Sequence, residues 1–317
     1  MKSISFKKLS AILLALCLIS IVGCDKADEK QAKTLSKPEP VVTATVLTPE
    51  QILANPQILH EPLRVKNPNY QNQAQFEENP EIGFVGDFSK DKLVDLSPLQ
   101  GIPFGALDLK GLTMSSIEPL KGMPLKLLGL EDTRISDLSP LRGMKLVKLY
   151  LNNSPVHDLT PLAGMPLTEL MLVGTKLEDL GPLHGAPLQF LWVNETNISD
   201  ISPLSGCPIF SLSLHRTKVA DLTPLSNMVS LKRLHIGETA VSDLTPLKGL
   251  ALERLIFNPE NIKNGLEIIQ NMPTLTELGV TLETRMPPAE FWAMLDQGKV
   301  QYCMVLNLIK TGSKRFN

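Results

Sequence analysis

Residues 125–144 read L-K-L-L-G-L-E-D-T-R-I-S-D-L-S-P-L-R-G-M, and a copy of this pattern begins 21 residues later, at Leu146. Each copy opens with L-x-x-L-x-L, whose second leucine is called the key leucine below. An internal period of this length is typical of proteins built from stacked repeats. The key leucines recur at intervals of 21 to 23 residues and are Leu107, Leu128, Leu149, Leu170, Leu191, Leu212, Leu234, Leu255 and Leu278.

The segments within one copy have different conformational preferences. The alternation in L-x-L predicts a short β-strand whose leucines point inward. The later D-L-S-P-L segment predicts a 3₁₀ turn or a single α turn, with serine or threonine as the N-cap and proline at the first helical position. The G-M-P segment then returns the chain to the next strand. Each copy is therefore expected to contribute one strand and one turn.

The pattern resembles the leucine-rich repeat. This resemblance implies an α/β solenoid of about nine coils of 21–23 residues, with a parallel sheet on the concave face and short 3₁₀ turns on the convex face. An open solenoid exposes its core at both ends, so we expect caps. We predict an N-terminal cap at residues 48–92, repeats at 93–282, and a C-terminal cap and tail at 283–317. Helix-start signals lie at Thr48 and Pro288.

Two polar positions recur in register with the key leucines. A hydroxyl follows each of six key leucines by five residues, where the common repeat has an asparagine that bonds to the backbone of a neighbouring turn. We expect the hydroxyl to replace part of that function. An aspartate four residues further on is placed to cap the turn, and we favour this interpretation over a ladder of metal ligands. The hydroxyl residues are Thr133, Ser154, Thr175, Thr196, Thr217 and Thr239, and the aspartates are Asp137, Asp158, Asp179, Asp200, Asp221 and Asp243.

The first 24 residues have the features of a lipoprotein signal. Three lysines precede an apolar stretch that is too short to span a membrane. The stretch ends in I-V-G-C, which resembles the lipobox of bacterial lipoproteins and implies cleavage after residue 23 and lipid chains such as palmitate on Cys24. A plain secretory signal with a chance cysteine is the alternative. Residues 24–47 are expected to form a flexible tether, and Asp25 resembles an inner-membrane retention signal.

Composition narrows the function classes. The 317 residues carry a net charge of −2, which disfavours nucleic acid as a partner. Four cysteines are too few for a dense disulfide framework. Cys207 takes a core position in its coil and Cys303 lies beyond the last repeat, so we predict that both are free thiols. We expect a monomeric solenoid with no cofactor and no metal.

A wider resemblance covers residues 48–298. These residues are similar to the leucine-rich-repeat regions appended to planctomycete-type bacterial serine/threonine protein kinases. The shared motifs are L-T-P-E-Q at 47–51, N-P-N-Y at 67–70 and P-A-E-F-W at 288–292. The resemblance implies a fold and a general role in binding, but the sequence contains no Gly-rich nucleotide loop and no catalytic loop. The repeats also resemble those of internalins more loosely.

Side chains one residue before and one, three and four residues after each key leucine are expected to point out of the concave face. Aromatic residues and arginine are common in binding hot spots, and Tyr150, Phe190 and Trp192 are predicted to gather in the centre of that face. The alternative is that sheets collect aromatic residues through β-propensity alone. We expect an acidic flank at Glu131 and Asp132 and a basic flank of arginines that includes Arg254. The predicted partner-binding residues are Tyr150, Met171, Phe190, Trp192, His215, Arg216, Arg233 and His235.

These observations predict a non-catalytic adaptor, anchored in the bacterial cell envelope, that recognises a protein partner through the concave face. The periplasmic face of the inner membrane is favoured by Asp25, with the outer membrane as the alternative. A second reading is a glycan or peptidoglycan-fragment binder, since Tyr150, Phe190 and Trp192 have rings that can stack on sugars. A less favoured reading is a hydrolase with Ser213 as nucleophile and His235 as base. No carboxylate is obviously placed to orient that imidazole.

Overall fold

The computed structural model describes residues 46–298, so Cys24, the signal segment, most of the tether and Cys303 lie outside the described residues. Eleven strands form one sheet and follow one another in sequence order. The first two strands pair antiparallel, and every later pair is parallel. The strands are β1 Gln75–Asn79, β2 Gly83–Asp87, β3 Phe104–Asp108, β4 Leu127–Gly129, β5 Lys148–Tyr150, β6 Glu169–Met171, β7 Phe190–Trp192, β8 Ser211–Ser213, β9 Arg233–His235, β10 Arg254–Ile256 and β11 Glu277–Gly279.

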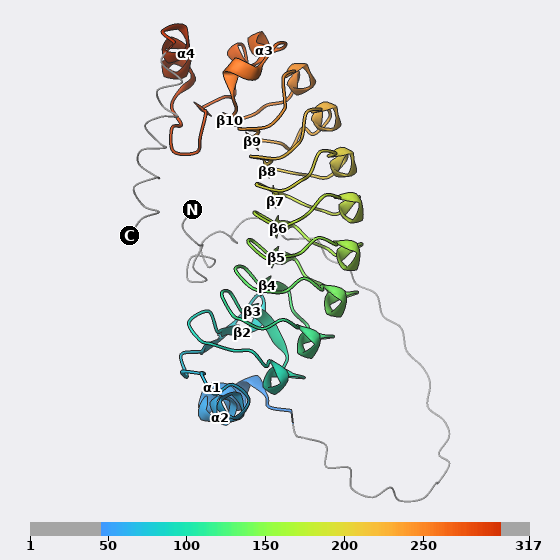
Figure 1. The fold of residues 1–317 in the computed structure, drawn as a ribbon, viewed down its shortest axis with the longest axis vertical. Helices are drawn as coiled ribbons and strands as arrows, with labels where there is room; N and C mark the ends of the chain where they lie inside the picture. Colours follow the sequence, from blue (N-terminus) through green and yellow to red (C-terminus); the bar gives the residue numbers. More distant parts are fainter. Residues whose placement is uncertain (1–45, 299–317) are drawn as a thin grey trace, which may run out of the picture. The chain divides into compact units, whose positions relative to one another are not determined.

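The leucine period determines this sheet. Each key leucine lies in one strand from β3 to β11 and is at most 1% exposed, which confirms the prediction of nine coils. Burying one leucine side chain contributes about 1.5–3 kcal/mol, so the stacked leucines form the main stabilising core. The 3₁₀ turns stack in a column on the side away from the strands (Figure 1). They are η2 Ser97–Leu99, η3 Glu118–Leu120, η4 Ser139–Leu141, η5 Thr160–Leu162, η6 Gly181–Leu183, η7 Ser202–Leu204, η8 Thr223–Leu225 and η9 Thr245–Leu247. A further 3₁₀ turn, η10 Pro259–Asn261, follows soon after β10 and is not part of this column.

The aspartate column caps these turns, as predicted. In all six coils the Oδ1 atom of the aspartate accepts the backbone N–H two residues later, at 2.7–2.8 Å. The expectation that serine or threonine is the N-cap is wrong. Leu138 holds that position in η4, and Ser139 is the first residue of the turn. The reason is that the aspartate accepts the N–H of the serine itself, which places the serine inside the turn.

The hydroxyl column also differs from the expectation. Thr175 Oγ1 donates to the carbonyl oxygen of Leu172, three residues earlier in its own coil, at 2.8 Å, and the other five hydroxyls make the same bond. From this position of the coil the hydroxyls bond within their own coil and do not cross to a neighbouring one. Asparagines three residues after a key leucine make that longer contact: Asn152 accepts from Val173 N, and Asn194 accepts from His215 N.

Each of the seven strands from β3 to β9 is followed by a backbone position with left-handed geometry, four residues after the key leucine. Glycine occupies it in two coils, at Gly111 and Gly174. Five coils place a residue with a side chain there, with φ between 55° and 57°. This conformation costs energy for any residue other than glycine. The five residues are Asp132, Asn153, Glu195, Arg216 and Glu238.

The two ends of the coil stack have different closures. At the N-terminal end lie helices α1 Pro49–Ala54 and α2 Gln57–Lys66, and Thr48 forms a capping box with Gln51, which confirms the predicted helix start. At the C-terminal end lie α3 Leu266–Gln270 and α4 Pro288–Asp296 (Figure 1). Phe291 of α4 is 1% exposed and packs against Phe257 of the last coils. No helix within residues 46–298 is long and apolar enough to cross a membrane.

Candidate binding surface

Strand pairing places the residues beside the key leucines in two parallel rows. The row before the key leucines runs from Lys148 to Glu277, and the row after them runs from Tyr150 to Ile256. Successive residues in a row are about 4.8 Å apart, the spacing of neighbouring strands. We call the surface made by these two rows the strand face. All predicted binding residues except His215 and Arg216 lie in these rows, and those two lie two and three residues after the end of β8.

Tyr150 and Met171 are not exposed as expected, since each is only 8% accessible to solvent. The Tyr150 hydroxyl donates to Glu169 Oε1 at 3.1 Å, and Lys148 Nζ lies 2.9 Å from Glu169 Oε2. Burial, followed by the nearby Glu169 charge, raises the pKa of the Tyr150 phenol. The burial of Tyr150 and Met171 has a simple cause. At the strand spacing, the large side chains of adjacent coils cover one another, and the polar groups of this region bond among themselves.

The centre of the strand face carries a cluster of half-buried aromatic side chains. Phe190 and Trp192 flank the key leucine of β7, and the Phe210 ring lies 5.8 Å from that of Phe190. The guanidinium of exposed Arg233 lies over the Phe210 ring, 5.3 Å from its centroid. We call Phe190, Trp192, Phe210 and Arg233 the aromatic patch. Sequence reasoning missed Phe210 because the side chains expected on this face were those one residue before and one, three and four residues after the key leucine. Phe210 lies two residues before its own key leucine.

His215 and His235 form a stacked pair beside the aromatic patch. Their ring centroids are 4.6 Å apart, with 19° between the ring planes. His215 Nδ1 donates to the carbonyl oxygen of Gly237 at 2.9 Å. His235 is 7% exposed, which corrects the expectation that it contributes to the surface. Burial, and secondarily the charge of His215, lowers the pKa of His235 to about 3, so its imidazole is neutral at physiological pH.

The predicted pair of Ser213 and His235 is in contact but lacks other parts of a hydrolytic site. Ser213 Oγ lies 3.3 Å from His235 Nδ1, within reach of a weak hydrogen bond, and both residues are buried. His235 Nε2 is buried and has no hydrogen-bond partner within residues 46–298. A base in a serine hydrolase is oriented by a carboxylate bonded to its second nitrogen. The geometry therefore favours packing as the function of this pair.

Arg216, in the predicted basic flank, is neutralised by two glutamates. Arg216 donates from Nε to Glu238 Oε2 at 2.7 Å and from Nη2 to Oε1 at 3.1 Å, and Glu195 lies 3.5 Å away on the other side. The expectation of an available charge at Arg216 is thus corrected, because three left-handed positions of successive coils bring these charges together. Lys110 similarly lies between Glu131 and Asp132, at 3.7 and 3.5 Å, in the acidic flank.

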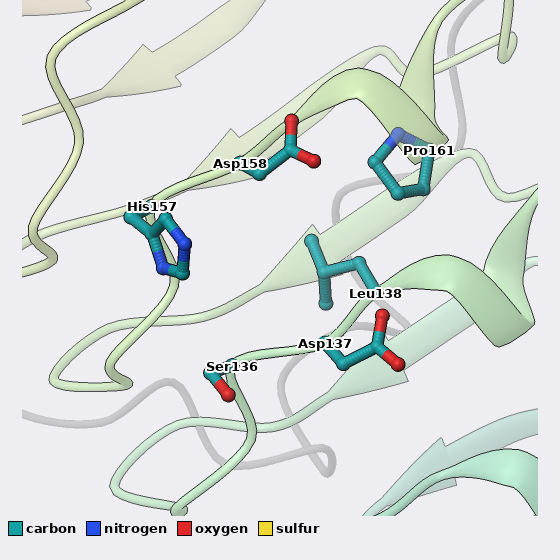
Figure 2. A pocket seen from close by; sticks show the side chains of 6 residues that line it. All are labelled: Ser136, Asp137, Leu138, His157, Asp158 and Pro161. Atoms are coloured by element: carbon teal, nitrogen blue, oxygen red, sulfur yellow. The ribbon is translucent and has the colours of Figure 1, made fainter.

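A separate open hollow of about 240 Å³ lies on the turn side between two coils (Figure 2). Asp137 and Asp158 line it from successive coils, with His157 beside them (Figure 2). Both carboxylates already accept hydrogen bonds from the turns they cap, and these bonds hold their pKa values below the usual range. The hollow is therefore explained by turn capping. Cys207 is buried and free, as predicted.

Comparison with known proteins supports the repeat architecture. No protein-family model matches the chain, and no curated protein sequence matches it. An internalin (inlF) from Listeria monocytogenes is 28% identical, with a TM-score of 0.57 over 62% of this chain and 59% of the internalin. An internalin C2 (inlC2) of the same species is 25% identical, with a TM-score of 0.49 over 53% of this chain and 76% of that chain.

A leucine-rich-repeat protein of Leptospira interrogans is 19% identical, with a TM-score of 0.46 over 58% of this chain and 56% of that chain. The match to inlF spans less than two thirds of that internalin. The eleven-strand sheet, the 3₁₀ turns and the likeness to inlF together define a leucine-rich-repeat domain.

Proposed function

We propose that this chain is a lipid-anchored protein of the bacterial cell envelope that binds a protein partner through the strand face of its leucine-rich-repeat domain. The observation that carries the proposal is the aromatic patch on β7–β9. Half-buried aromatic rings and an exposed arginine at the centre of a surface are the residue types that dominate protein–protein hot spots. The likeness to an internalin supports a repeat domain that works by recognition.

The packing of the strand face concentrates this function in a small area. Tyr150 and Met171 are covered, and Arg216 is held by two glutamates. The apolar rings that stay half-buried are Phe190, Trp192 and Phe210. A rigid sheet that presents three rings at fixed spacing loses little conformational entropy when a partner binds. The partner is therefore expected to contact coils β7 to β9 first.

The anchor part of the proposal rests on sequence. The I-V-G-C segment that ends at Cys24 supports lipidation, and two or three acyl chains give stable membrane attachment. Asp25 favours the periplasmic face of the inner membrane, with the outer membrane as the alternative. A tether of residues 24–47 separates the anchor from the repeats.

Photo-crosslinking in the native cell tests the binding surface. A photoreactive amino acid at position 192 is expected to yield discrete protein adducts, because a bound partner covers the patch. The matched control is the same amino acid at Val229, which is 76% exposed and lies outside the strand face. Phe190→Ala combined with Phe210→Ala is expected to remove the position-192 adducts.

Other outcomes would count against the proposal. Equal adducts at positions 192 and 229, or none at 192, contradict a protein partner on this face. Binding of glycans or peptidoglycan fragments that Trp192→Ala abolishes would favour the second candidate, in which the half-exposed rings stack on sugars. A hydrolase activity that Ser213→Ala removes would favour the enzyme reading.

The anchor has its own test. Cys24→Ala is expected to shift the protein from the membrane to the soluble fraction and to remove the mass of the lipid chains. Membrane association that survives this change would contradict lipidation at Cys24.

A further inference from the structure

Two arginines of the strand face are in an unfavourable position. Arg233 and Arg254 are directly opposite each other in the register of β9 and β10. Like charges at opposite positions of a sheet destabilise it. The two side chains reach in opposite directions: Arg254 bonds to Glu277 on β11, whereas the Arg233 guanidinium lies over Phe210, which directly precedes β8. The strand face therefore retains one arginine, Arg233, whose guanidinium contacts an aromatic ring and pairs with no carboxylate within residues 46–298.

The charges around this position do not balance. Glu277 accepts from Arg254 Nε, and Arg285 Nη1 lies 3.3 Å from the same carboxylate. The hydrogen bond from Arg254, and then the positive charges of Arg254, Arg285 and Arg233, lower the pKa of Glu277. Arg254 and Arg285 thus share one carboxylate, and Arg233 has no ion-pair partner within residues 46–298. The local surplus of positive charge lies next to the aromatic rings.

We propose that the strand face recognises an acidic segment of its protein partner, with a carboxylate of that segment bound to Arg233 and a nearby apolar side chain packed on Phe190 and Trp192. This inference rests on the proposed function and specifies the chemistry of the partner. A guanidinium forms two parallel hydrogen bonds to a carboxylate. The ring of Phe210 holds the arginine in place before the partner arrives, so less side-chain entropy is lost on binding.

The register also defines the spacing that the segment needs. Arg233 and Phe190 are two strands apart in the same row, with Ser211 between them. Two strand spacings are about 10 Å, which an extended peptide covers in about three residues. The segment is therefore expected to carry an aspartate or glutamate about three residues from a large apolar side chain. Charge complementarity favours this acidic partner over a neutral or basic one.

A peptide array tests this assignment with the full-length protein in detergent micelles. The probes are short synthetic peptides that combine acidic and aromatic residues at varied spacing. Each has a neutral counterpart with Asp→Asn and Glu→Gln. The wild type is expected to bind acidic peptides at least about tenfold more tightly than their counterparts. Arg233→Ala is expected to remove that preference, and Arg216→Ala, which alters an arginine already paired with Glu238 and Glu195, is expected to retain it.

The outcomes separate this inference from the proposed function. Equal affinity of the wild type for acidic and neutral peptides overturns the inference. An Arg233→Ala variant that weakens both forms equally also overturns it, because the arginine then acts through packing alone. The wild type could bind acidic and neutral peptides equally and lose both on Trp192→Ala. In that case the protein-binding function is supported and the inference of an acidic segment is wrong. Tighter binding of polygalacturonate than of any peptide would assign the arginine to an acidic glycan instead.

Discussion

At the scale of single residues, position within the coil decides whether a side chain is available or buried. His235 lies in the row after the key leucines, yet it is 7% exposed because the His215 ring stacks on it. Arg233, two residues earlier in the same strand, is exposed. An exposed imidazole would titrate near neutrality, whereas burial lowers the pKa of His235 to about 3. At physiological pH the same strand thus carries a charged guanidinium and a neutral imidazole.

This burial predicts a specific dependence of stability on pH. In the unfolded chain His235 has a pKa of about 6.5. Below that pH its imidazole is protonated in the unfolded chain but stays neutral in the folded chain. Stability is therefore lost as pH falls from about 6.5 towards 3. Replacing His235 by leucine is expected to make the loss between about pH 7 and 4.5 smaller by roughly 1–3 kcal/mol, as measured by urea unfolding. His157→Ala, at an exposed histidine, is the control and is expected to lose as much stability over this pH range as the wild type. The prediction is contradicted if the His235→Leu variant also loses as much stability as the wild type.

At the scale of the element, each coil is a strand and a 3₁₀ turn held by a few repeated polar bonds. The aspartate supplies the acceptor for the turn, the hydroxyl satisfies a carbonyl of its own coil, and asparagine links neighbouring coils. The turn η6 is the simplest case, because its first residue is Gly181, which has no hydroxyl to add a second bond to Asp179.

Asp179→Ala is therefore expected to destabilise the protein by about 0.5–2 kcal/mol, since the Gly181 N–H loses its acceptor. Asp179→Asn is the matched variant: its amide oxygen can accept the same hydrogen bond, so most of the stability should remain. Thermal or urea unfolding of the three proteins measures the difference. Divalent metal ions are expected to leave all three unfolding curves unchanged. If a metal ion stabilised the wild type alone, the aspartates would be better interpreted as metal ligands.

Much of this element-level architecture follows from sequence, because leucine and proline recur with one period and each has a single conformational effect. The strands, the turns, the aspartate caps and the starts of helices α1 and α4 were all predictable. The burial of Tyr150 and Met171 was not, because it depends on how side chains of adjacent coils cover each other. The bond of Thr175 to Leu172 was also unpredictable, since spacing alone does not identify which carbonyl a short hydroxyl reaches. In the candidate site, the position of Phe210 on the strand face was likewise not predictable from its spacing to the key leucine.

At the scale of the whole domain, stability depends on closing the ends of the coil stack. Each coil contacts only its neighbours, so a terminal coil lacks one of the two interfaces that an internal coil has. Phe291 of α4 covers the last coils by packing against Phe257, with Trp292 edge-on beside it. The cap thus protects leucines that would otherwise meet water.

Phe291→Ala is expected to cost about 3–5 kcal/mol, the usual range for deleting a buried ring. The loss should begin at the C-terminal coils, since coils are coupled only to their neighbours. Hydrogen exchange is therefore expected to accelerate most at the amides of β10 and β11 and least at β4 and β5. Met294→Ala, at a partly buried position of the same helix, should have a smaller effect. A uniform acceleration along the sheet would contradict end-localised opening.

The sequential order of the strands in the sheet also affects the rate of folding. Parallel strands usually pair across long stretches of chain, and that separation slows folding. Here each strand from β4 to β11 pairs with a strand whose key leucine lies only 21 to 23 residues earlier. The entropy of loop closure grows with the logarithm of the separation, so every coil closes at nearly the same small cost. An extended parallel sheet is thereby assembled from contacts that are local in sequence, one turn of the spiral after another.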